Sequence, residues 1–341
     1  MNDSASAQSA FSAGVAAFQS GDYAAAGAHF LRALQADPNH AEAHQWAAGV
    51  DLRAGRFREA LERLEAACRL APDNARFHAD AAMTCWKLGQ REAALRHAEK
   101  AVSLAPHSLA AHEFLAGIRL PGPEYLEVIA MIQSHLRPST YLEIGVQTGR
   151  SIALAGPETR AIGVDPTPRV AIPLGPQVSI RAMTSDDYFA SDHVSADLGG
   201  QTIDLAFIDG MHRFEFALRD FVNIERRCSR RSTILIHDCY PLTRLTAERE
   251  AQTDFWSGDV WRLVLILRKY RPELSVNVIA TAPTGLGVVR GLDPASMLLS
   301  ERMPEIMSEY LALDYSVLDD DQAGLLALYP NDWEKIKALL A

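Results

Sequence analysis

Residues 140–151 read TYLEIGVQTGRS, and the pattern of this stretch indicates the fold class of the second half of the chain. A short apolar run includes Glu143, and Gly145 and Gly149 follow with three residues between them. Glycines directly after a strand let the backbone turn sharply and approach a ligand closely. Their spacing differs from the GxGxxG pattern that seats a pyrophosphate at a helix start. A carboxylate just before the first glycine favours instead a ligand with a cationic amine or sulfonium group.

The segments around this motif alternate between strand and helix. Apolar, β-branched runs predict strands at 140–145, 161–165, 178–183, 203–210, 232–238, 276–281 and 285–291. Helical spacing of apolar residues predicts helices that begin in 149–155 and cover 214–228 and 260–270. Strands buried on both faces that alternate with helices form a mostly parallel sheet wound on both sides. The sequence therefore predicts a Rossmann-like α/β domain, whose ligand binds outside the carboxyl ends of the strands.

Polar residues at the expected strand ends suggest one ligand in particular. Asp165 ends the second strand and is placed to accept hydrogen bonds from ribose hydroxyls. A nucleoside with a positively charged amino-acid tail fits both this acid and Glu143, and S-adenosylmethionine is such a molecule. Residues after the third strand are expected near its adenine ring. The expected cofactor-binding residues are Glu143, Gly145, Gly149, Ser151, Asp165, Ser185 and Asp186.

Two longer stretches resemble a known family. EIGVQTGRS (143–151) resembles the first motif of class I methyltransferases, in the form of catechol-type and caffeoyl-CoA-type O-methyltransferases. FIDGMHRFEFALRDF (207–221), followed by ILIHD (234–238), resembles the group that includes macrolide-sugar O-methyltransferases. The resemblance covers about residues 125–291. It implies S-adenosylmethionine-dependent methylation of a hydroxyl group on a small molecule or sugar.

The resemblance also implies a metal and a base. In metal-dependent relatives, carboxylates at the ends of the fourth and fifth strands hold a divalent cation, and those positions match Asp209 and Asp238. His212 follows Asp209 by three residues and is expected to act as general base, because its pKa lies near working pH. His237 stands where the relatives carry a carboxylate, and Mg²⁺ seldom binds histidine. Three alternatives stay open: Mn²⁺ with His237 as a ligand, a metal without His237, or no metal.

The first third of the chain is a repeat. GDYAAA begins at Gly21, GRFREA at Gly55 and GQREAA at Gly89, a period of 34 residues. Alanines and prolines recur in register, at 26, 60 and 94 and at 38, 72 and 106. The pattern resembles the tetratricopeptide repeat, with three units of two helices and a lone first helix of a fourth unit at 108–120. It implies a protein partner or self-association, although a scaffold that only packs on its neighbour domain is the alternative.

Seven histidines lie in this repeat region, and their spacing shows no metal-binding pattern. We therefore expect no zinc site there. The four cysteines form no CxxC pair, which argues against disulfides and cysteine zinc sites and favours a reducing cytoplasm. The histidines are His29, His40, His44, His78, His97, His107 and His112, and the cysteines are Cys68, Cys85, Cys228 and Cys239.

Composition narrows the classes of partner. The 341 residues are 48% hydrophobic and carry a formal net charge of −10, so a nucleic acid is not expected as partner. The basic stretch RRCSRR at 226–231 is expected to end a helix, because cations interact favourably with the negative end of the helix dipole. No apolar run is long enough for a membrane span, and the first twenty residues lack the features of a signal peptide.

The chain is expected to divide into three segments. Prolines on both sides of a glycine at 120–125 end the repeats, so we expect helical repeats at 1–120 and the α/β domain at 121–292. Residues 293–341 are expected to form a helical extension without strands. Two other functions stay open beside hydroxyl methylation. The repeats could be a binding scaffold attached to a non-catalytic methyltransferase fold, or they could hold a protein substrate for methylation.

Overall fold

The structure is a computed structural model that describes residues 2–341, with side chains described from Ala5 onward. The chain forms two compact units, one ending at Arg119 and one running from Leu120 to Ala341. Each unit has its own hydrophobic clusters of buried residues. Among the described residues, no helix combines the length and the apolar character needed to cross a membrane.

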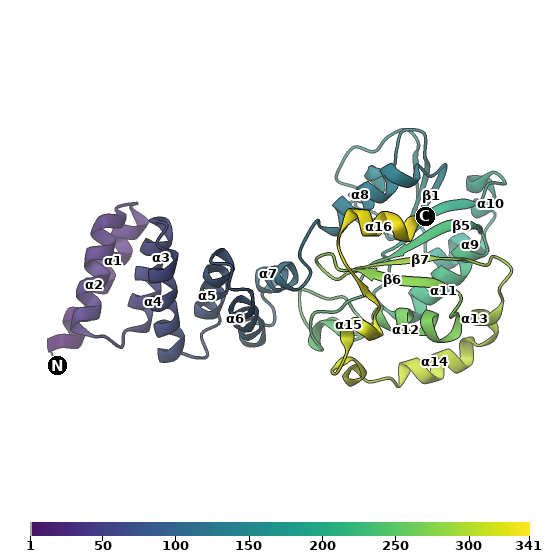
Figure 1. The fold of residues 1–341 in the computed structure, drawn as a ribbon. Helices are drawn as coiled ribbons and strands as arrows, with labels where there is room; N and C mark the ends of the chain where they lie inside the picture. Colours follow the sequence, from purple (N-terminus) through teal and green to yellow (C-terminus); the bar gives the residue numbers. More distant parts are fainter. Residues whose placement is uncertain (1) are drawn as a thin grey trace. The chain divides into compact units, whose positions relative to one another are not determined.

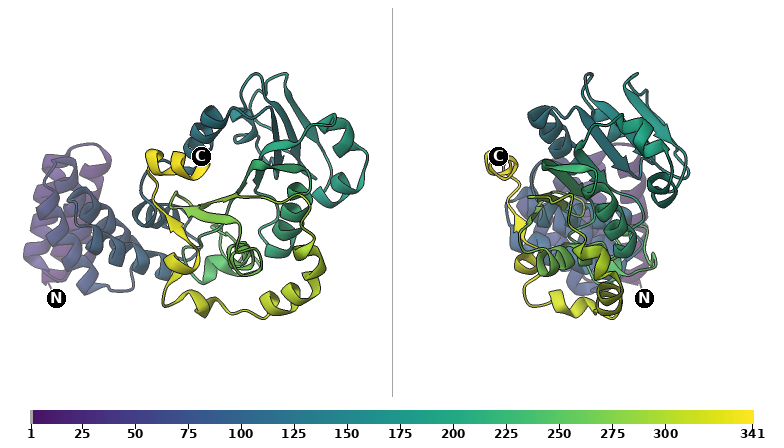
Figure 2. Two further views of the ribbon diagram at one scale, coloured as in Figure 1. Left: turned by 45° about the vertical axis from the view of Figure 1, so that its right-hand side comes forward. Right: turned by 90° about the vertical axis from the view of Figure 1, so that its right-hand side faces the viewer.

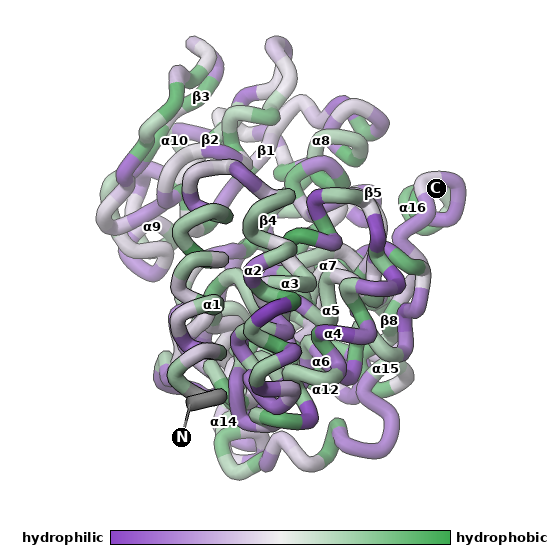
Figure 3. The backbone as a smooth tube through the Cα atoms, turned by 90° about the vertical axis from the view of Figure 1, so that its left-hand side faces the viewer, coloured by the Kyte–Doolittle hydropathy of each residue, from purple (hydrophilic) through white to green (hydrophobic). Residues whose placement is uncertain are grey.

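The first unit consists of antiparallel helix pairs, as the 34-residue period predicts (Figure 1). Alanines at the recurring positions are fully buried, so consecutive helices approach closely. Gly21, Gly55 and Gly89 adopt positive φ angles of 85°, 74° and 73° and turn the chain between the helices of each pair. Polar and hydrophobic residues alternate along these helices (Figure 3). The helices are α1 (Asn2–Gln19), α2 (Tyr23–Ala36), α3 (Ala41–Arg53), α4 (Phe57–Leu70), α5 (Ala75–Lys87), α6 (Arg91–Leu104) and α7 (Leu109–Arg119).

The second unit is built on an eight-stranded sheet with the order β3-β2-β1-β4-β5-β7-β6-β8. The first five strands in this order are parallel, β7 is antiparallel to both neighbours, and β8 is parallel to β6. The predicted mostly parallel sheet is thus confirmed. The strands are β1 (Thr140–Ile144), β2 (Arg160–Val164), β3 (Val178–Arg181), β4 (Ile203–Ile208), β5 (Cys228–Ile236), β6 (Ser275–Ile279), β7 (Leu286–Arg290) and β8 (Leu328–Tyr329).

Helices cover both faces of this sheet. Successive side chains of β1 point to opposite faces, so Tyr141 packs into the apolar cluster on one face and Leu142 into the cluster on the other. Both faces therefore need a helical cover. One face carries α8 (Tyr125–Leu136), the short 3₁₀ helix η1 (Ile152–Leu154) and α16 (Trp333–Leu340), and α16 lies beside α8 in Figure 2. The other face carries α9 (Ser185–Ala190), α10 (His193–Leu198), α11 (Phe214–Glu225), α12 (Trp261–Tyr270), α13 (Leu298–Glu301) and α14 (Met303–Leu311). The remaining short helices are η2 (Leu245–Ala247), η3 (Tyr315–Leu318) and α15 (Gln322–Leu325).

Three predicted segments differ from the structure. The helix expected from residue 149 is only the three-residue η1, because Pro157 disfavours helical backbone just before it. The stretch 226–231 ends a helix only at its first residue, because Arg226 caps α11 and β5 already begins at Cys228, which pairs with Ile203 of β4. The segment after 292 does contain a strand, because Leu328 and Tyr329 pair with the open edge of β6. In the last two cases, pairing with a distant strand overrides the local pattern.

A buried ion pair ties the helical layer to the chain after β7. Arg271, whose side chain is 1% exposed, donates to both carboxylate oxygens of Glu225 on α11, at 2.8 and 3.0 Å. Glu225 also accepts a hydrogen bond from the backbone N–H of Asp293. A buried charge that loses its partner is left uncompensated. Removal of either Arg271 or Glu225 alone is therefore expected to destabilise the second unit.

Replacement of Arg271 by alanine is expected to lower the free energy of unfolding of the second unit by about 3–5 kcal/mol, because Glu225 would remain buried and unpaired. Chemical denaturation of the whole chain, monitored by hydrogen exchange of peptides from the sheet, measures this loss in unfolding free energy. Arg302→Ala is the matched control, since Arg302 and Glu305 form an ion pair in which both side chains are more than half exposed. That variant should lose less than about 1 kcal/mol. Equal losses in the two variants would contradict the role of the buried pair.

Candidate functional site

A cavity of about 450 Å³ lies at the carboxyl ends of the central strands. The strand order reverses between β1 and β4, so the loops that follow these strands diverge and leave a crevice. Its volume is within the range of sites for small organic ligands. Its lining includes Tyr125, Gly145, Ser151, Asp165, Ser185, Asp186, Asp209, Met211, Phe216 and Asp220.

The loop after β1 explains the two glycines of the opening motif. Gly145 has φ +89°, and a Cβ atom there would lie 1.9 Å from the backbone oxygen of Asp209. Gly149 has φ +84°, and its N–H donates to the carbonyl of Val146 at 2.8 Å. The first glycine is therefore required for close approach of the two strand ends, and the second closes the turn.

Asp165 organises the same loop. Its Oδ2 accepts hydrogen bonds from the backbone N–H groups of Val146 and Gln147, at 3.0 and 2.8 Å. Its Oδ1 accepts one from the N–H of Thr167 at 2.7 Å. A carboxylate has about four acceptor positions, so one remains for a ligand in the cavity that Asp165 lines.

Glu143 is fully buried and lies outside the set of residues that line the cavity. The hydroxyls of Tyr141 and of the cavity residue Ser151 donate to its two carboxyl oxygens, at 2.6 and 2.7 Å. Burial raises the pKa of Glu143 to about 8. Its carboxyl group thus links the middle of β1 to the loop that follows, and its expected contact with a cationic ligand stays a prediction.

The far end of the cavity is formed by residues after β3 and on α11. Ser185 and Asp186 both line it, as expected, and Asp186 forms a bidentate ion pair with Arg219. Asp220 also lines this end of the cavity and was not among the predicted site residues. Its Oδ1 is buried without a hydrogen-bond partner, and burial raises the pKa of Asp220 to about 7, against the effect of a hydrogen bond with Ser185.

Asp209, His212 and Asp238 come together at the ends of β4 and β5. One ligand atom of each lies within 4.8 Å of the others, an arrangement that could hold a metal ion. His212 Nε2 is 3.2 Å from Asp238 Oδ2, and His212 Nδ1 is 2.9 Å from the carbonyl oxygen of Trp256. Because a carbonyl only accepts, Nδ1 carries a proton. The Nε2 and carboxylate oxygen that face each other then need a proton or a cation between them.

His237 lies beside this group rather than within it. Its Nδ1 is 3.1 Å from Asp209 Oδ1 and 3.5 Å from Asp238 Oδ2, and its Nε2 is 3.4 Å from the hydroxyl of Thr284. Burial would lower the pKa of His237, but the two carboxylates overcome that effect and hold it well above its usual value. Both ring nitrogens thus face acceptors, which suits a protonated imidazolium that donates to the carboxylates.

Asp238 is held in a backbone conformation that few residues other than glycine adopt, with φ +59°. The Thr284 hydroxyl donates to its Oδ1 at 2.7 Å. Burial would raise the pKa of Asp238, whereas His212 and His237 lower it. The carboxylate therefore stays charged inside the protein, and backbone strain of this kind is typical of functional positions.

The loop after β5 positions His212. Trp256 stacks on the His212 ring with centroids 5.0 Å apart, and its indole N–H donates to the Glu248 carbonyl. A Cβ atom on Gly258 would lie 1.7 Å from the His212 carbonyl oxygen, so only glycine permits this approach. Phe255 and Trp261 are buried in the core.

Tyr125, Asp220 and Thr284 are among the site residues that sequence reasoning missed. Tyr125 lines the cavity and its ring lies 4.4 Å from that of His237; burial, with Asp209 nearby, raises its pKa to about 12. Asp220 follows Phe216 by four residues, so the two share a helix face. That spacing could have predicted that both line the cavity. Thr284 reaches the site only through the pairing of β7 with β5, which has no local signature.

Comparison with protein families gives three matches. Tetratricopeptide-repeat profiles match residues 17–83 and 75–108, and a methyltransferase-domain profile matches residues 142–239. The chain therefore carries N-terminal tetratricopeptide repeats followed by a methyltransferase domain, as the sequence resemblance implied. S-adenosylmethionine is the usual cofactor of such a domain. Comparison with curated proteins finds no match.

Several solved structures are similar to a third of this chain. MamA from Desulfovibrio magneticus RS-1 is 28% identical with a TM-score of 0.32, over 33% of this chain and 64% of that one. The first TPR domain of Spaghetti (RPAP3), bound to an HSP90 peptide, is 22% identical with a TM-score of 0.33, over 34% and 91%. The Yersinia enterocolitica chaperone SycD, in complex with a YopD peptide, is 18% identical with a TM-score of 0.32, over 33% and 92%. The chain thus spans 64% of the length of MamA.

Gly145→Ala is expected to destabilise the second unit more than Gly200→Ala does. Both glycines have positive φ, which costs an alanine about 1–2 kcal/mol, but a Cβ atom on Gly200 would meet nothing within 4 Å. At Gly145 the added atom also collides with the Asp209 backbone, so the two strand ends must move apart. Chemical denaturation of both variants measures the difference. Equal losses would show that the close approach is not required.

Glu143→Gln is expected to change how stability depends on pH. The folded chain keeps Glu143 protonated up to about pH 8, whereas the unfolded chain ionises it near 4.5. Unfolding then releases a proton between these values, so Glu143 lowers the unfolding free energy as pH rises through this window. Glutamine removes the effect, and the variant should gain stability relative to the parent toward pH 8.

Denaturation curves of the parent and Glu143→Gln at about pH 5, 6.5 and 8 test this linkage. Glu301→Gln is the control, because Glu301 is exposed at the end of α13, and its curve should run parallel to that of the parent. A Glu143→Gln curve that also runs parallel would contradict a neutral Glu143.

Proposed function

We propose that this chain transfers the methyl group of S-adenosylmethionine to a hydroxyl group of a small molecule or sugar. One observation carries the proposal: a single cavity is lined both by Asp165, suited to a ribose, and by Asp209, which belongs to the Asp209–His212–Asp238 group. The cofactor site and a group able to hold a proton or cation thus adjoin at the reversal of strand order. The tetratricopeptide repeats suggest a protein partner or self-association beside this activity.

The cavity residues fit the cofactor in three respects. Asp165 retains an acceptor position for ribose hydroxyls after three backbone hydrogen bonds. Asp220 offers a buried carboxyl oxygen without a partner near Ser185, where an adenine amino group would find an acceptor. The cavity also has carboxylates and few cations, since Arg150 is its one lysine or arginine among the described lining residues. Such a wall favours a positively charged sulfonium ligand.

The residues at the ends of β4 and β5 fit a divalent cation. Asp209 and Asp238 supply oxygen atoms, which Mg²⁺ and Mn²⁺ prefer. His237 donates to these carboxylates, so we assign it to holding them in place rather than to the metal. When bound here, a cation would lower the pKa of a coordinated hydroxyl group.

His212 is the group suited to accept a proton. The Trp256 carbonyl holds the proton on Nδ1 and the indole stacks on the ring, so Nε2 is left to accept a proton once a cation held by Asp209 and Asp238 offsets the facing carboxylate. Asp238 beside Nε2 then stabilises the imidazolium that forms. In the reaction the acceptor oxygen bonds to the methyl carbon, the carbon–sulfur bond breaks toward sulfur, and the hydroxyl proton passes to His212.

Calorimetric titration with S-adenosylhomocysteine, with Mg²⁺ or Mn²⁺ and again with EDTA, tests the proposal. We expect micromolar binding to the parent chain, weakened about tenfold or more in Asp165→Asn, because a charged acceptor for the ribose is lost. Asp209→Asn should bind without a metal effect and should not turn over hydroxyl acceptors. Asp319→Asn, an exposed acid in the C-terminal segment, is the control and should behave as the parent.

Absence of binding under all conditions would overturn the enzymatic proposal and favour a repeat scaffold. Methyl transfer to a protein that persists in EDTA would overturn the hydroxyl acceptor while leaving the cofactor assignment in place.

A further inference from the structure

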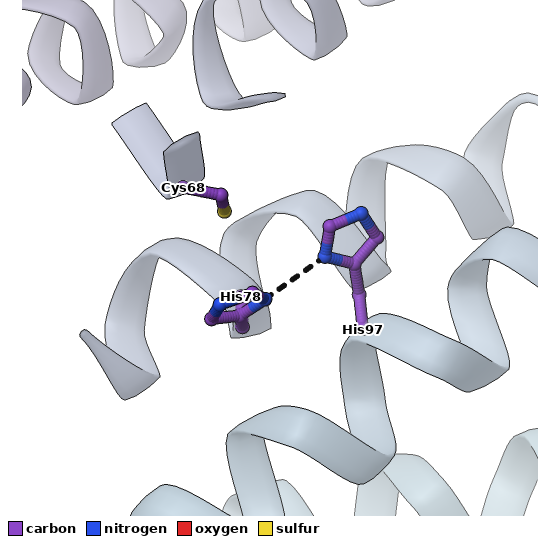
Figure 4. Close-up of side chains that lie close together, drawn as sticks. All are labelled: Cys68, His78 and His97. Atoms are coloured by element: carbon purple, nitrogen blue, oxygen red, sulfur yellow. Dashed lines mark hydrogen bonds between the residues drawn. The ribbon is translucent and has the colours of Figure 1, made fainter. Parts of the chain in front are cut away.

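Three side chains in the repeat unit converge from three consecutive helices: Cys68 on α4, His78 on α5 and His97 on α6 (Figure 4). One ligand atom of each, a sulfur or a ring nitrogen, lies within 4.8 Å of the others. His78 Nδ1 and His97 Nδ1 are 3.1 Å apart. The sequence predicts no metal site in this region, but the structure brings three possible ligand side chains together. Residues that show no metal spacing along the chain become neighbours when the helices stack.

The orientation of His78 is set by the backbone. Its Nε2 lies 3.0 Å from the carbonyl oxygen of Pro72, which can only accept, so Nε2 carries the proton. Nδ1 therefore presents a lone pair toward His97. A ligating histidine usually has its other nitrogen fixed in this way by a carbonyl or carboxylate.

The preceding repeat shows which of these three residues the repeat fold itself explains. His44 occupies the position one period before His78, and its Nε2 makes the same contact with the Pro38 carbonyl at 2.9 Å. The proline contact thus explains why a histidine stands at this repeat position. It does not explain the neighbours of His78, because the positions that correspond to Cys68 and His97 in the preceding repeat are Leu34 and Arg63.

We propose that Cys68, His78 and His97 bind a divalent transition-metal ion of the zinc type, with a fourth position open to water. A thiolate and two imidazoles suit such an ion and do not suit Mg²⁺. Two nitrogens on a tetrahedral zinc ion lie about 3.3 Å apart, close to the 3.1 Å that separates these two. Cys68 and His78 are buried and His97 is partly exposed, which leaves a route for the ion.

Binding requires three lone pairs. The ion replaces the thiol proton of Cys68, which is released to solvent. His78 already presents a lone pair, and His97 places its proton on Nε2 so that Nδ1 becomes free to bind. The bound ion then links α4, which belongs to one repeat, to α5 and α6 of the next. Because repeats of this kind are stabilised by contacts with their neighbours, such a link adds to the stability of the stack.

Cobalt titration of the whole chain, after removal of metals by a chelator, tests this site. We expect one equivalent of Co²⁺ to give a thiolate-to-cobalt charge-transfer absorption that Zn²⁺ then abolishes. The group formed by Asp209, His212 and Asp238 has no sulfur and cannot give this absorption. The signal therefore reports on the repeat unit alone, and its presence or absence is independent of the proposed methyl transfer.

Matched variants assign the ligands. Cys68→Ser and His97→Gln should lose the absorption while their circular dichroism stays that of the folded chain. His44→Gln and Cys85→Ser should keep it, since one removes the equivalent histidine of the preceding repeat and the other removes a buried thiol elsewhere on α5. Zn²⁺ should also raise the melting temperature of the repeats in the parent and not in Cys68→Ser. No absorption in the parent, or absorption that persists in Cys68→Ser, would overturn the proposal.

Discussion

The candidate site depends on the close approach of the ends of β1 and β4. The Asp209 N–H donates to the Ile144 carbonyl at 2.8 Å, and the Gly145 N–H donates to the Val164 carbonyl at 2.9 Å on the other side of β1. A side chain at position 145 would collide with the Asp209 backbone. The same contact therefore joins the loop after β1, which lines the cavity, to Asp209, the first member of the Asp209–His212–Asp238 group. The crevice at this strand reversal has its shape because the two backbones touch here.

The carboxyl groups near this contact differ in charge because their hydrogen-bond partners and burial differ. Asp165 is compensated by three backbone N–H groups, and Asp238 is compensated by two imidazoles that lower its pKa. Glu143 has only hydroxyl and backbone partners in a fully buried place, and its pKa rises to about 8. The negative charge is thus concentrated where a cationic ligand would meet it, while the strand interior beneath stays neutral.

Sequence patterns predicted the features that local periodicity controls. Continuous apolar runs predicted the strands, and the 34-residue period predicted the helix pairs with their glycine turns. Residues directly after strands, such as Asp165 and Asp209, were found because a strand end is visible in the sequence. Thr284 and the start of β5 were missed, because only pairing between distant strands places them. Glu143 was identified as important from its motif, but its burial, and hence its neutral state, depends on packing that no spacing reveals.

The same reasoning explains why the cysteine–histidine group was not expected and why it differs from the strand-end group. Local spacing identifies metal sites whose ligands lie on one turn or one helix, whereas Cys68, His78 and His97 meet only because stacked repeats bring three helices together. The two groups also differ in donor chemistry. Sulfur and imidazole select zinc-like ions, and two carboxylates with water select Mg²⁺ or Mn²⁺. One chain can therefore hold a structural ion in its repeats without competing for the ion that would serve at the strand ends, because selection is made by the donor atoms.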